Sequence, residues 1–308
     1  MPARPRTVGD WLRRAEARYA RQGAALGQVA TTAHDEALYL LLRTLQLPLT
    51  SRATVLRRVV TAEESARIEE VFARRLDERI PAAYLTREAW LGPHRFYVDE
   101  RVIIPRSYFL ELLPEQIPHW LPANRPVKRV VDVCTGSGCL AVLLARRFPR
   151  AKVDAIELSP DALAVARFNL AQHRLADRVR LWRSDVFDAV PRARYDLILA
   201  NPPYVPHREL ARLPAEFRRE PALALDGGRD GFAVIRKLLL QARDRLQPHG
   251  VIALEVGGLR DAMDRAFAAL EPHWLHTVDG EDCVCVIQAE RLRRSLPDNR
   301  PGQAGVGD

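Results

Sequence analysis

The stretch that decides the fold is Val130-Val131-Asp132-Val133-Cys134-Thr135-Gly136-Ser137-Gly138. Its first four residues predict a buried strand, and its glycines mark a turn before a helix begins. A turn of this kind at the carboxyl end of a sheet strand lets the backbone approach a ligand closely. The stretch therefore predicts a cofactor-binding loop, but on its own it suits a dinucleotide about as well as other cofactors.

This loop lies in a part of the chain where short apolar runs alternate with helical patterns. Such alternation predicts a parallel sheet covered by helices on both faces. Near the end, two apolar runs flank Asp279-Gly280-Glu281-Asp282, which predicts a hairpin and an antiparallel last strand. We therefore expect an α/β, Rossmann-like, mostly parallel sheet. The expected strands are Arg129–Val133, Val153–Leu158, Val179–Ser184, Asp196–Ala200, Val251–Val256, His273–Val278 and Cys283–Ala289.

A small helical domain is expected before the sheet. Trp11, Ala15 and Tyr19 recur at fourfold spacing, and a second helix is expected over residues 36–45. Thr61 with Glu64 forms a capping-box pattern at the start of a third helix. The predicted domains are a helical domain (1–80), a linker (81–127), a catalytic domain (128–290) and a disordered tail (291–308). Within the linker we expect a hairpin built from short β-prone runs at 89–91, 96–98 and 102–104, followed by a short helix at 107–113.

Composition narrows the class of protein. Hydrophobic residues make up 47% and charged residues 28% of 308 residues, as in a folded globular chain. No apolar run reaches the roughly 18 residues of a membrane span, and no secretory signal begins the chain, so we expect a cytoplasmic protein with no membrane partner. The four cysteines lack metal-site spacing and are expected to be reduced, and no metal is expected.

The charge pattern points weakly to RNA. The net charge is +8, and only three of the 47 basic residues are lysines. Arginine suits phosphate, so a partner that contains RNA is allowed. The same arginine excess would also follow from genomic base composition.

Polar residues follow the expected strands and would meet at one edge of the sheet. Gly136 and Gly138 form GxG, and Ala141 stands where a dinucleotide loop has its third glycine, which leaves the cofactor undecided. Glu157, about 20 residues after the loop, could accept both ribose hydroxyls, as in both cofactor classes. Asp185 ends the third strand; it and Glu157 are alternatively helix caps. A buried Asp132 needs a partner, either a cofactor amine or loop amides.

Asn201-Pro202-Pro203-Tyr204 decides between the cofactors, because a dehydrogenase does not need it and an amino-directed methyltransferase does. An amide nitrogen is a poor nucleophile, since its lone pair is delocalised. The side-chain carbonyl of Asn201 and the backbone carbonyl of Pro202 can accept hydrogen bonds from both N–H groups. Pro203 stiffens the turn, and Tyr204 offers a face for stacking. The motif predicts methyl transfer by alignment, without a strong general base.

These motifs together resemble the class I methyltransferases that act on amino groups. The resemblance extends to Ile80–Thr86, Phe96–Arg106 and Glu220–Pro221 with Asp226–Gly231, which look like the protein-(glutamine-N5) methyltransferases. It covers about residues 8 to 290. The resemblance implies a helical substrate-recognition domain, S-adenosyl-L-methionine as cofactor, and methylation of a glutamine side-chain nitrogen.

The resemblance also implies roles for individual residues. It implies that Cys134, Thr135, Gly136, Ser137 and Gly138 cradle the methionine part of the cofactor and that Glu157 binds the ribose. It places Val186 by the adenine and counts Asp185 and Asn201 among the cofactor-binding residues. It also makes Asn201, Pro202, Pro203 and Tyr204 the holders of the target amide. Arg106 and Glu220 would line the access to the site; alternatively they are a solvated arginine and a surface carboxylate.

Two branches of that family differ in substrate. One acts on the Gly-Gly-Gln motif of peptide release factors, the other on large-subunit ribosomal protein uL3. Arg106–Leu112 and Tyr84–Trp90 look more like the uL3 branch, although Tyr108-Phe109 departs from it. The rival functions are methylation of an adenine amino group in nucleic acid, which would require access to an unstacked base, and a cofactor-binding assembly factor without chemistry.

Overall fold

The computed structural model describes residues 7–297, which form two compact units. The first, here called the helical unit, contains the chain up to Arg106 together with Ala211–Pro221. The second, here called the sheet unit, contains Ser107–Leu210 and the chain from Ala222 onward. The domain boundaries at residues 80, 127 and 290 remain a prediction, and the two units divide the chain at other places. Within residues 7–297, no helix is both long and apolar enough to cross a membrane.

The helical unit is built from four α-helices within the described residues, and a threonine side chain caps the start of each of the first three. Thr7 and Thr61 each accept a hydrogen bond from the backbone three residues ahead, and Asp10 and Glu64 return one, so the capping box predicted at Thr61 is confirmed. The elements are α1 (Val8–Gln22), α2 (Ala33–Thr44), α3 (Ala62–Leu76) and α4 (Ala82–Thr86), with the 3₁₀ helices η1 (Ala53–Arg57) and η3 (Phe217–Arg219).

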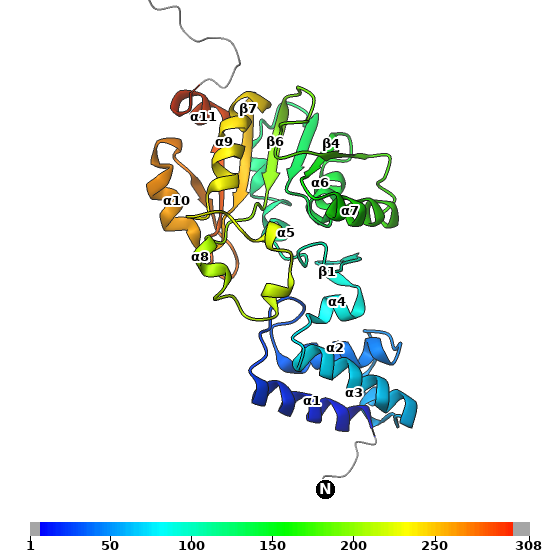
Figure 1. Ribbon diagram of the computed structural model, residues 1–308. Helices are drawn as coiled ribbons and strands as arrows, with labels where there is room; N and C mark the ends of the chain where they lie inside the picture. The colour runs from blue at the N-terminus through cyan, green and yellow to red at the C-terminus, as the bar shows by residue number, and fades with distance from the viewer. Residues whose placement is uncertain (1–6, 298–308) are drawn as a thin grey trace, which may run out of the picture. The chain divides into compact units, whose positions relative to one another are not determined.

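The expected apolar faces of α1 and α3 form the core of this unit. Trp11, Ala15 and Tyr19 are all buried, and they pack with Ile68 and Phe72 of α3. Because positions three and four residues apart share one face of a helix, this packing follows directly from the spacing in the sequence. The blue and cyan helices in Figure 1 are this bundle.

A buried charge cluster lies beside this core. The side chain of Arg75 is 1% exposed, and its guanidinium contacts Glu36 at 2.6 Å and Glu216 at 3.2 Å. Tyr19 also donates to Glu36 at 2.7 Å. Glu216 comes from the segment 211–221, so these ion pairs fasten a distant piece of sequence to the helices. No periodic pattern in the sequence indicated this attachment.

The predicted hairpin is present but shorter and differently placed. β1 (Ala89–Leu91) pairs with β2 (His94–Phe96) in antiparallel register. The expected strands at 96–98 and 102–104 are wrong, because the turn at 92–93 brings His94 opposite Leu91 and the pairing ends at Phe96. Val98, Val102 and Ile104 are nevertheless buried, so their apolar character reflects core packing and not a strand.

The sheet unit contains a seven-stranded sheet in the order β5-β4-β3-β6-β7-β9-β8. The five strands from β5 to β7 are parallel, and β9 is antiparallel to both neighbours. The strands are β3 (Arg129–Val133), β4 (Lys152–Glu157), β5 (Val179–Arg183), β6 (Tyr195–Ala200), β7 (Leu246–Glu255), β8 (His273–Leu275) and β9 (Val284–Gln288). The predicted α/β fold with an antiparallel last strand is confirmed, and β9 lies between β7 and β8.

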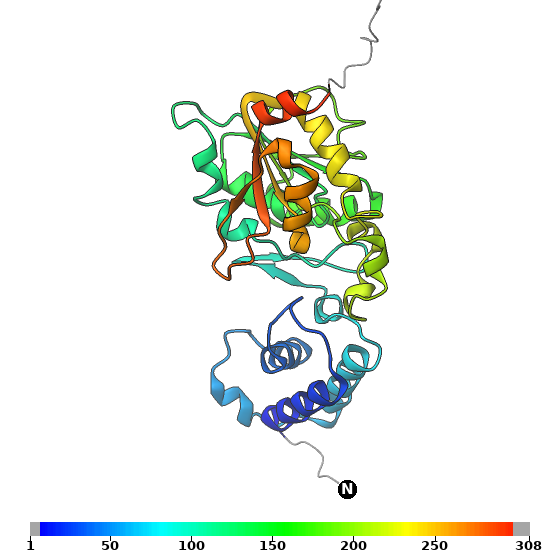
Figure 2. The same cartoon turned by 90° about the vertical axis from the view of Figure 1, so that its left-hand side faces the viewer.

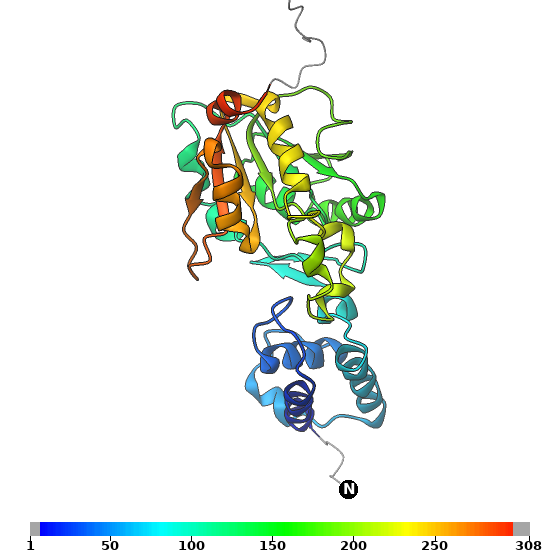
Figure 3. The same cartoon turned by 60° about the vertical axis from the view of Figure 1, so that its left-hand side comes forward.

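Helices cover both faces of this sheet. α6 (Cys139–Arg147) and α7 (Pro160–Gln172) pack on β3, β4 and β5, and α9 (Ala233–Arg245) packs on β7 (Figures 1 and 3). The apolar side chains of α9 join those of β3, β6 and β7 in one core. Figure 2 shows α10 (Arg260–Ala266) beside β9 and β8. The remaining short helices are α5 (Phe109–Leu112), η2 (Ile117–Trp120), α8 (His207–Leu210), η4 (Ala222–Ala224), η5 (Gly257–Leu259) and η6 (Ala268–Leu270).

The prediction that the chain is disordered from residue 291 is wrong for its first residues, which belong to a helix. α11 spans Ala289–Ser295, and its Leu292 is fully buried. The apolar Ala289 and Leu292 dock this helix on the sheet unit, which an arginine-rich composition does not reveal. The rest of the predicted tail, 298–308, lies outside the described residues.

Candidate active site

The strand order places the candidate site at the point where the chain moves from one side of β3 to the other. β4 and β5 lie on one side of β3, and β6 and β7 lie on the other. In open α/β sheets, ligands bind at such a switch point, beyond the carboxyl ends of the strands. Val133 pairs with Ala200, so the glycine loop after β3 and Asn201 after β6 begin side by side. Two motifs about 65 residues apart in sequence are thus brought together at the sheet edge expected for a ligand.

The glycine loop adopts a backbone that depends on its sequence. Gly136 and Gly138 have φ values of 54° and 82°, and Cys134 has a φ of 65°. A Cβ at Gly138 would also come within 3.3 Å of the Cβ of Ala166. Left-handed backbone is costly for residues other than glycine, so Cys134 stores strain at the start of the loop. Such strain is typical of functional loops.

Asp132 is fully buried and only half satisfied. Its Oδ2 accepts a hydrogen bond from the Thr135 hydroxyl at 2.5 Å, and its Oδ1 has no hydrogen-bond partner in the part of the chain described. Burial raises the pKa of this carboxyl to about 7. An open carboxylate oxygen at this depth is costly unless a donor meets it. The cationic amine of a methionine-like group supplies such a donor, so the site fits the expected cofactor.

Glu157 ends β4 and is bonded to the loop. Its Oε2 accepts from the backbone N of Gly136 at 2.9 Å, and its Oε1 accepts from the backbone N of both Leu158 and Ser159 at 2.9 Å. The side chain therefore braces the glycine loop in addition to capping the following turn. A carboxylate has about four lone-pair positions, so one position on Oε2 stays available to a ribose hydroxyl.

Asp185 and Val186 follow β5 in different environments. Half of the Asp185 side chain is exposed, and its carboxylate contacts the Lys237 ammonium at 2.7 Å. Val186 is buried with a φ of 52°. A β-branched residue in this region of backbone space is a genuine outlier, which often marks a ligand site. Val186 is thus the stronger candidate of the two for contact with a flat ring.

The motif after β6 presents two unused hydrogen-bond acceptors. Pro202 and Pro203 are buried, whereas Asn201 and Tyr204 are half-buried. Neither the side chain of Asn201 nor the carbonyl of Pro202 has a hydrogen-bond partner among residues 7–297. The two oxygens are therefore available to a ligand, and their role as acceptors for both N–H groups of an incoming amide remains a prediction.

Two glycines that the motif analysis did not place in the site hold Tyr204. A Cβ at Gly257 would lie 2.5 Å from Cε2 of the Tyr204 ring. A Cβ at Gly231 would lie 2.5 Å from the Tyr204 carbonyl oxygen. Both glycines have positive φ values, 52° and 86°. Gly257 could have been suspected from the Gly-Gly pair that directly follows an expected strand.

Glu255 is a further residue that sequence reasoning missed. It ends β7 one step after the Ala200–Leu254 pair, so it begins its loop next to Asn201. The carboxylate is 5% exposed and accepts a hydrogen bond from Ser107 at 2.5 Å. A buried acid at the carboxyl end of a parallel strand was the available signal, the same signal that identified Glu157.

Arg106 and Glu220 both belong to the helical unit and contact each other. The guanidinium binds the carboxylate through two contacts of 2.7 Å, and Gln28 donates to the same carboxylate at 2.5 Å. The Glu220 side chain is completely buried, so the alternative of a surface carboxylate is wrong. This bidentate pair fastens the segment 211–221 within its unit. A role for either residue toward a substrate remains a prediction.

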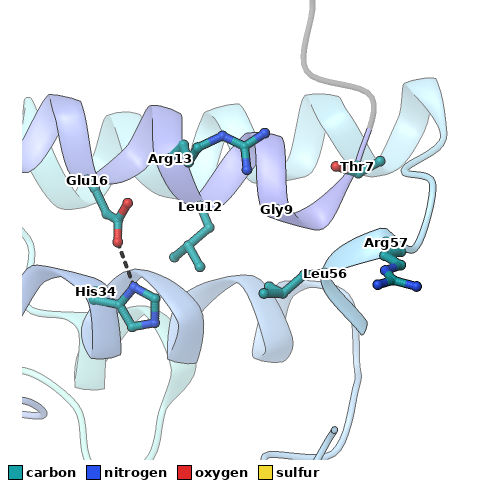
Figure 4. Close-up of a pocket in the computed structure, with 8 residues that line it drawn as sticks. All are labelled: Thr7, Gly9, Leu12, Arg13, Glu16, His34, Leu56 and Arg57. Carbon is teal, nitrogen blue, oxygen red and sulfur yellow. Dashed lines mark hydrogen bonds and ion pairs between the residues drawn. The ribbon is translucent and has the colours of Figure 1, made fainter. Parts of the chain in front are cut away.

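Two hollows are lined by residues outside these motifs. One, of about 500 Å³, is in the helical unit and is lined by Gly9, Leu12, Leu56 and several charged side chains (Figure 4). Its charges are largely paired, since His34 contacts Glu16 at 2.6 Å and Arg13 contacts Asp10 at 2.6 Å. The other, of about 480 Å³, is in the sheet unit beside the loop after Tyr204. No predicted site residue lines either hollow.

A family model described as the methyltransferase small domain matches residues 111–228. Among solved structures, the hMettl16 catalytic domain in complex with a MAT2A 3′UTR hairpin is similar, with a TM-score of 0.49 and 17% identity over 83% of this chain and 91% of that chain.

Curated relatives are much more similar in sequence. A ribosomal protein uL3 glutamine methyltransferase of Bordetella pertussis is 46% identical over 93% of this chain and 96% of its own length. The protein of the same name from Burkholderia pseudomallei is 45% identical with the same coverage, and that from Neisseria gonorrhoeae is 42% identical. With near-complete coverage of both chains at this identity, the chain belongs to the family of ribosomal protein uL3 glutamine methyltransferases, which are S-adenosylmethionine-dependent enzymes.

Proposed function

We propose that this protein methylates the side-chain amide nitrogen of a glutamine in ribosomal protein uL3. One observation carries the chemistry: the oxygens of Asn201 and Pro202 have no partner among residues 7–297 and lie at the switch point of the sheet, next to the half-satisfied Asp132. The relatives named for uL3 methylation support the substrate.

The residues around the glycine loop would hold S-adenosyl-L-methionine. Asp132 Oδ1 would accept from the amine, Glu157 would accept from the ribose, and Val186 would contact the adenine. Cys134, Thr135, Gly136, Ser137 and Gly138 would shape the wall between them, and the absence of a Cβ at Gly138 lets the loop pack against Ala166 of α7. When bound, the cofactor supplies an electrophilic methyl group on a sulfonium.

Asn201, Pro202 and Tyr204 would hold the acceptor amide. Two N–H groups pointed at two carbonyl oxygens fix the nitrogen and favour its pyramidal form, in which the lone pair is less delocalised. Pro202 has no N–H that could compete for the same oxygen. The Tyr204 ring, held by Gly257, would stack on the flat amide. Alignment of this kind can supply much of the reduction in the barrier.

We infer in addition that the substrate is met in the presence of ribosomal RNA, in an assembly intermediate. The net charge of +8, carried almost entirely by arginine, supports this partner. Arg106 and Glu220 would act near the substrate by keeping the segment 211–221 attached to the helical unit. The cytoplasm, where ribosomal proteins are made, is the proposed location.

Mass analysis of cells with and without this gene tests the proposal. Intact uL3 and the peptide release factors are measured from both strains. We expect uL3 to lose the mass of one methyl group in the deletion strain and the release factors to stay unchanged. Loss on the release factors alone would transfer the activity to the other branch, and no loss on any of these proteins would overturn the proposed function.

A further inference from the structure

The hollow beside the loop after Tyr204 is lined by two arginines and a histidine. Its volume is about 480 Å³, and its walls are His207, Arg208, Gly228 and Arg229. Pockets of roughly 300–1,000 Å³ are of the size that takes small-molecule groups. The hollow belongs to the sheet unit, as does the acceptor motif.

Backbone pairing connects this hollow to the acceptor motif. The backbone N of Val205 donates to Leu225 O, and that of Gly227 donates to Val205 O, both at 2.9 Å. The backbone N of His207 donates to Gly228 O at 2.8 Å. Since Val205 follows Tyr204 directly, this pairing fixes His207 and Arg229 a few residues beyond the proposed amide site. The loop that carries Arg229 also lies against the acceptor motif, because a Cβ at Gly231 would stand 2.5 Å from the Tyr204 carbonyl oxygen.

The carboxylates near the hollow are mostly occupied. Asp226 contacts the His207 ring at 2.9 Å and accepts from Gly228 N at 2.8 Å. Asp230 is bound by Arg236 through contacts of 2.9 and 2.5 Å.

The two arginines are therefore little neutralised. Within residues 7–297, the only carboxylate that meets Arg208 is Glu209 at 3.6 Å, and such a pair is weak because both side chains are well exposed. Arg229 is exposed and has no carboxylate partner among the residues described. Two arginine heads thus stay available to an anion.

We propose that this hollow binds a backbone phosphate of RNA that lies next to the target glutamine. The inference rests on the proposed function, because it takes the protein substrate to be accompanied by RNA. Arginine's planar fork matches the oxygens of a phosphate group, to which it can donate two parallel hydrogen bonds. The phosphate contact would position the RNA-bound protein and would carry no base specificity.

Binding of a defined RNA tests the hollow directly. The probe is a fluorescein-labelled single-stranded RNA of about 20 nucleotides, longer than one binding site, measured by fluorescence anisotropy at several salt concentrations. In the full-length double variant Arg208→Ala/Arg229→Ala, we expect the Kd to rise about tenfold and the slope of log Kd against log salt to fall by about 0.7, the value for one phosphate on a single strand. The matched control is Arg150→Ala/Arg192→Ala, which removes two exposed arginines near the amino ends of the strands; its Kd should change much less.

Methyl transfer separates this inference from the proposed function. On uL3 bound to ribosomal RNA, the activity of the double variant should fall by about the same factor as its affinity for RNA. On isolated uL3, its activity should stay close to that of the wild type. Equal RNA affinities in the double variant and the control would overturn the inference. An equal loss on isolated uL3 would also overturn it, because the hollow would then bind an acidic group of the protein. In either case, methylation of isolated uL3 by the wild-type enzyme would leave the proposed function standing.

Discussion

Gly257 lies against the ring of Tyr204 so closely that a Cβ at residue 257 would stand 2.5 Å from Cε2. The ring is therefore held in place by the absence of a side chain on a neighbouring loop. Gly258, the next residue, has no atom within 4 Å of its would-be Cβ. These two adjacent glycines provide a matched pair for testing the position of Tyr204.

The variant Gly257→Ala should displace the Tyr204 ring and slow methyl transfer. We expect kcat to fall about 10- to 100-fold, because a displacement of about 1 Å in a positioned group has effects of this size. Cofactor affinity should stay within about twofold, since the glycine loop after β3 is untouched. Gly258→Ala should leave kcat nearly unchanged, and an equal loss in both variants would show that the loop as a whole, and not the ring contact, matters.

Asn201→Ala should separate cofactor binding from turnover. The variant loses one of the two proposed acceptors of the amide N–H groups, so we expect kcat to fall about 100-fold or more. Calorimetric titration with S-adenosylhomocysteine should give a Kd close to that of the wild type. A variant that keeps strong turnover would contradict the proposed role of the Asn201 carbonyl.

Asp132 should make cofactor binding depend on pH. Burial raises the pKa of its carboxyl to about 7, so the ionised form that attracts a cationic amine appears only as the pH rises through this value. We expect the affinity for S-adenosylhomocysteine to increase between pH 6 and pH 8. Asp132→Asn should bind more weakly and with a flatter pH profile, as measured by calorimetry at both pH values.

The raised pKa of Asp132 also predicts how the stability of the cofactor-free protein depends on pH. A carboxyl whose pKa is higher in the folded state holds its proton more tightly there. The contribution of this carboxyl to the free energy of unfolding is therefore fully present below the ordinary pKa of aspartate, and it is lost as the pH rises through about 7. Thermal unfolding midpoints should show a smaller decline between pH 5 and pH 8 in Asp132→Asn than in the wild type. Parallel declines would contradict this contribution.

Arg75→Ala should destabilise the helical unit. The change leaves the buried Glu36 and Glu216 without their shared partner, and loss of one member of a buried ion pair costs about 3–5 kcal/mol. The measurement is urea unfolding followed by circular dichroism. Arg74, an exposed neighbour on the same helix, gives the control Arg74→Ala, which should change the free energy of unfolding by less than about 0.5 kcal/mol.

The sequence predicted those parts of the fold that depend on local pattern. The strand Arg129–Val133 has the predicted bounds, because a buried parallel strand is a short apolar run that ends at a turn. Thr61 and Glu64, three residues apart, likewise mark the start of α3, because Thr61 is its N-cap. The expected strands at 96–98 and 102–104 were wrong, since buried apolar residues in irregular chain show the same alternation as a strand.

What the sequence did not reveal depends on contacts between distant segments. The attachment of residues 211–221 to the helical unit rests on Glu216 and Glu220 meeting Arg75 and Arg106, more than 100 residues away in sequence. The insertion of β9 between β7 and β8, and the contact of Gly257 with Tyr204, are of the same kind. The candidate site itself was predictable in outline, because parallel strands bring their carboxyl ends to one edge.

The most direct test of the central claim is methylation by purified components. Isolated uL3, a release factor and ribosomal RNA are each incubated with the enzyme and S-adenosyl-L-methionine, and the products are mapped by tandem mass spectrometry, with Asn201→Ala run in parallel. We predict one methyl group on the side-chain nitrogen of a uL3 glutamine, and little of it with the variant. A methyl group on the release factor or on an RNA adenine, with uL3 unmodified, would contradict the account.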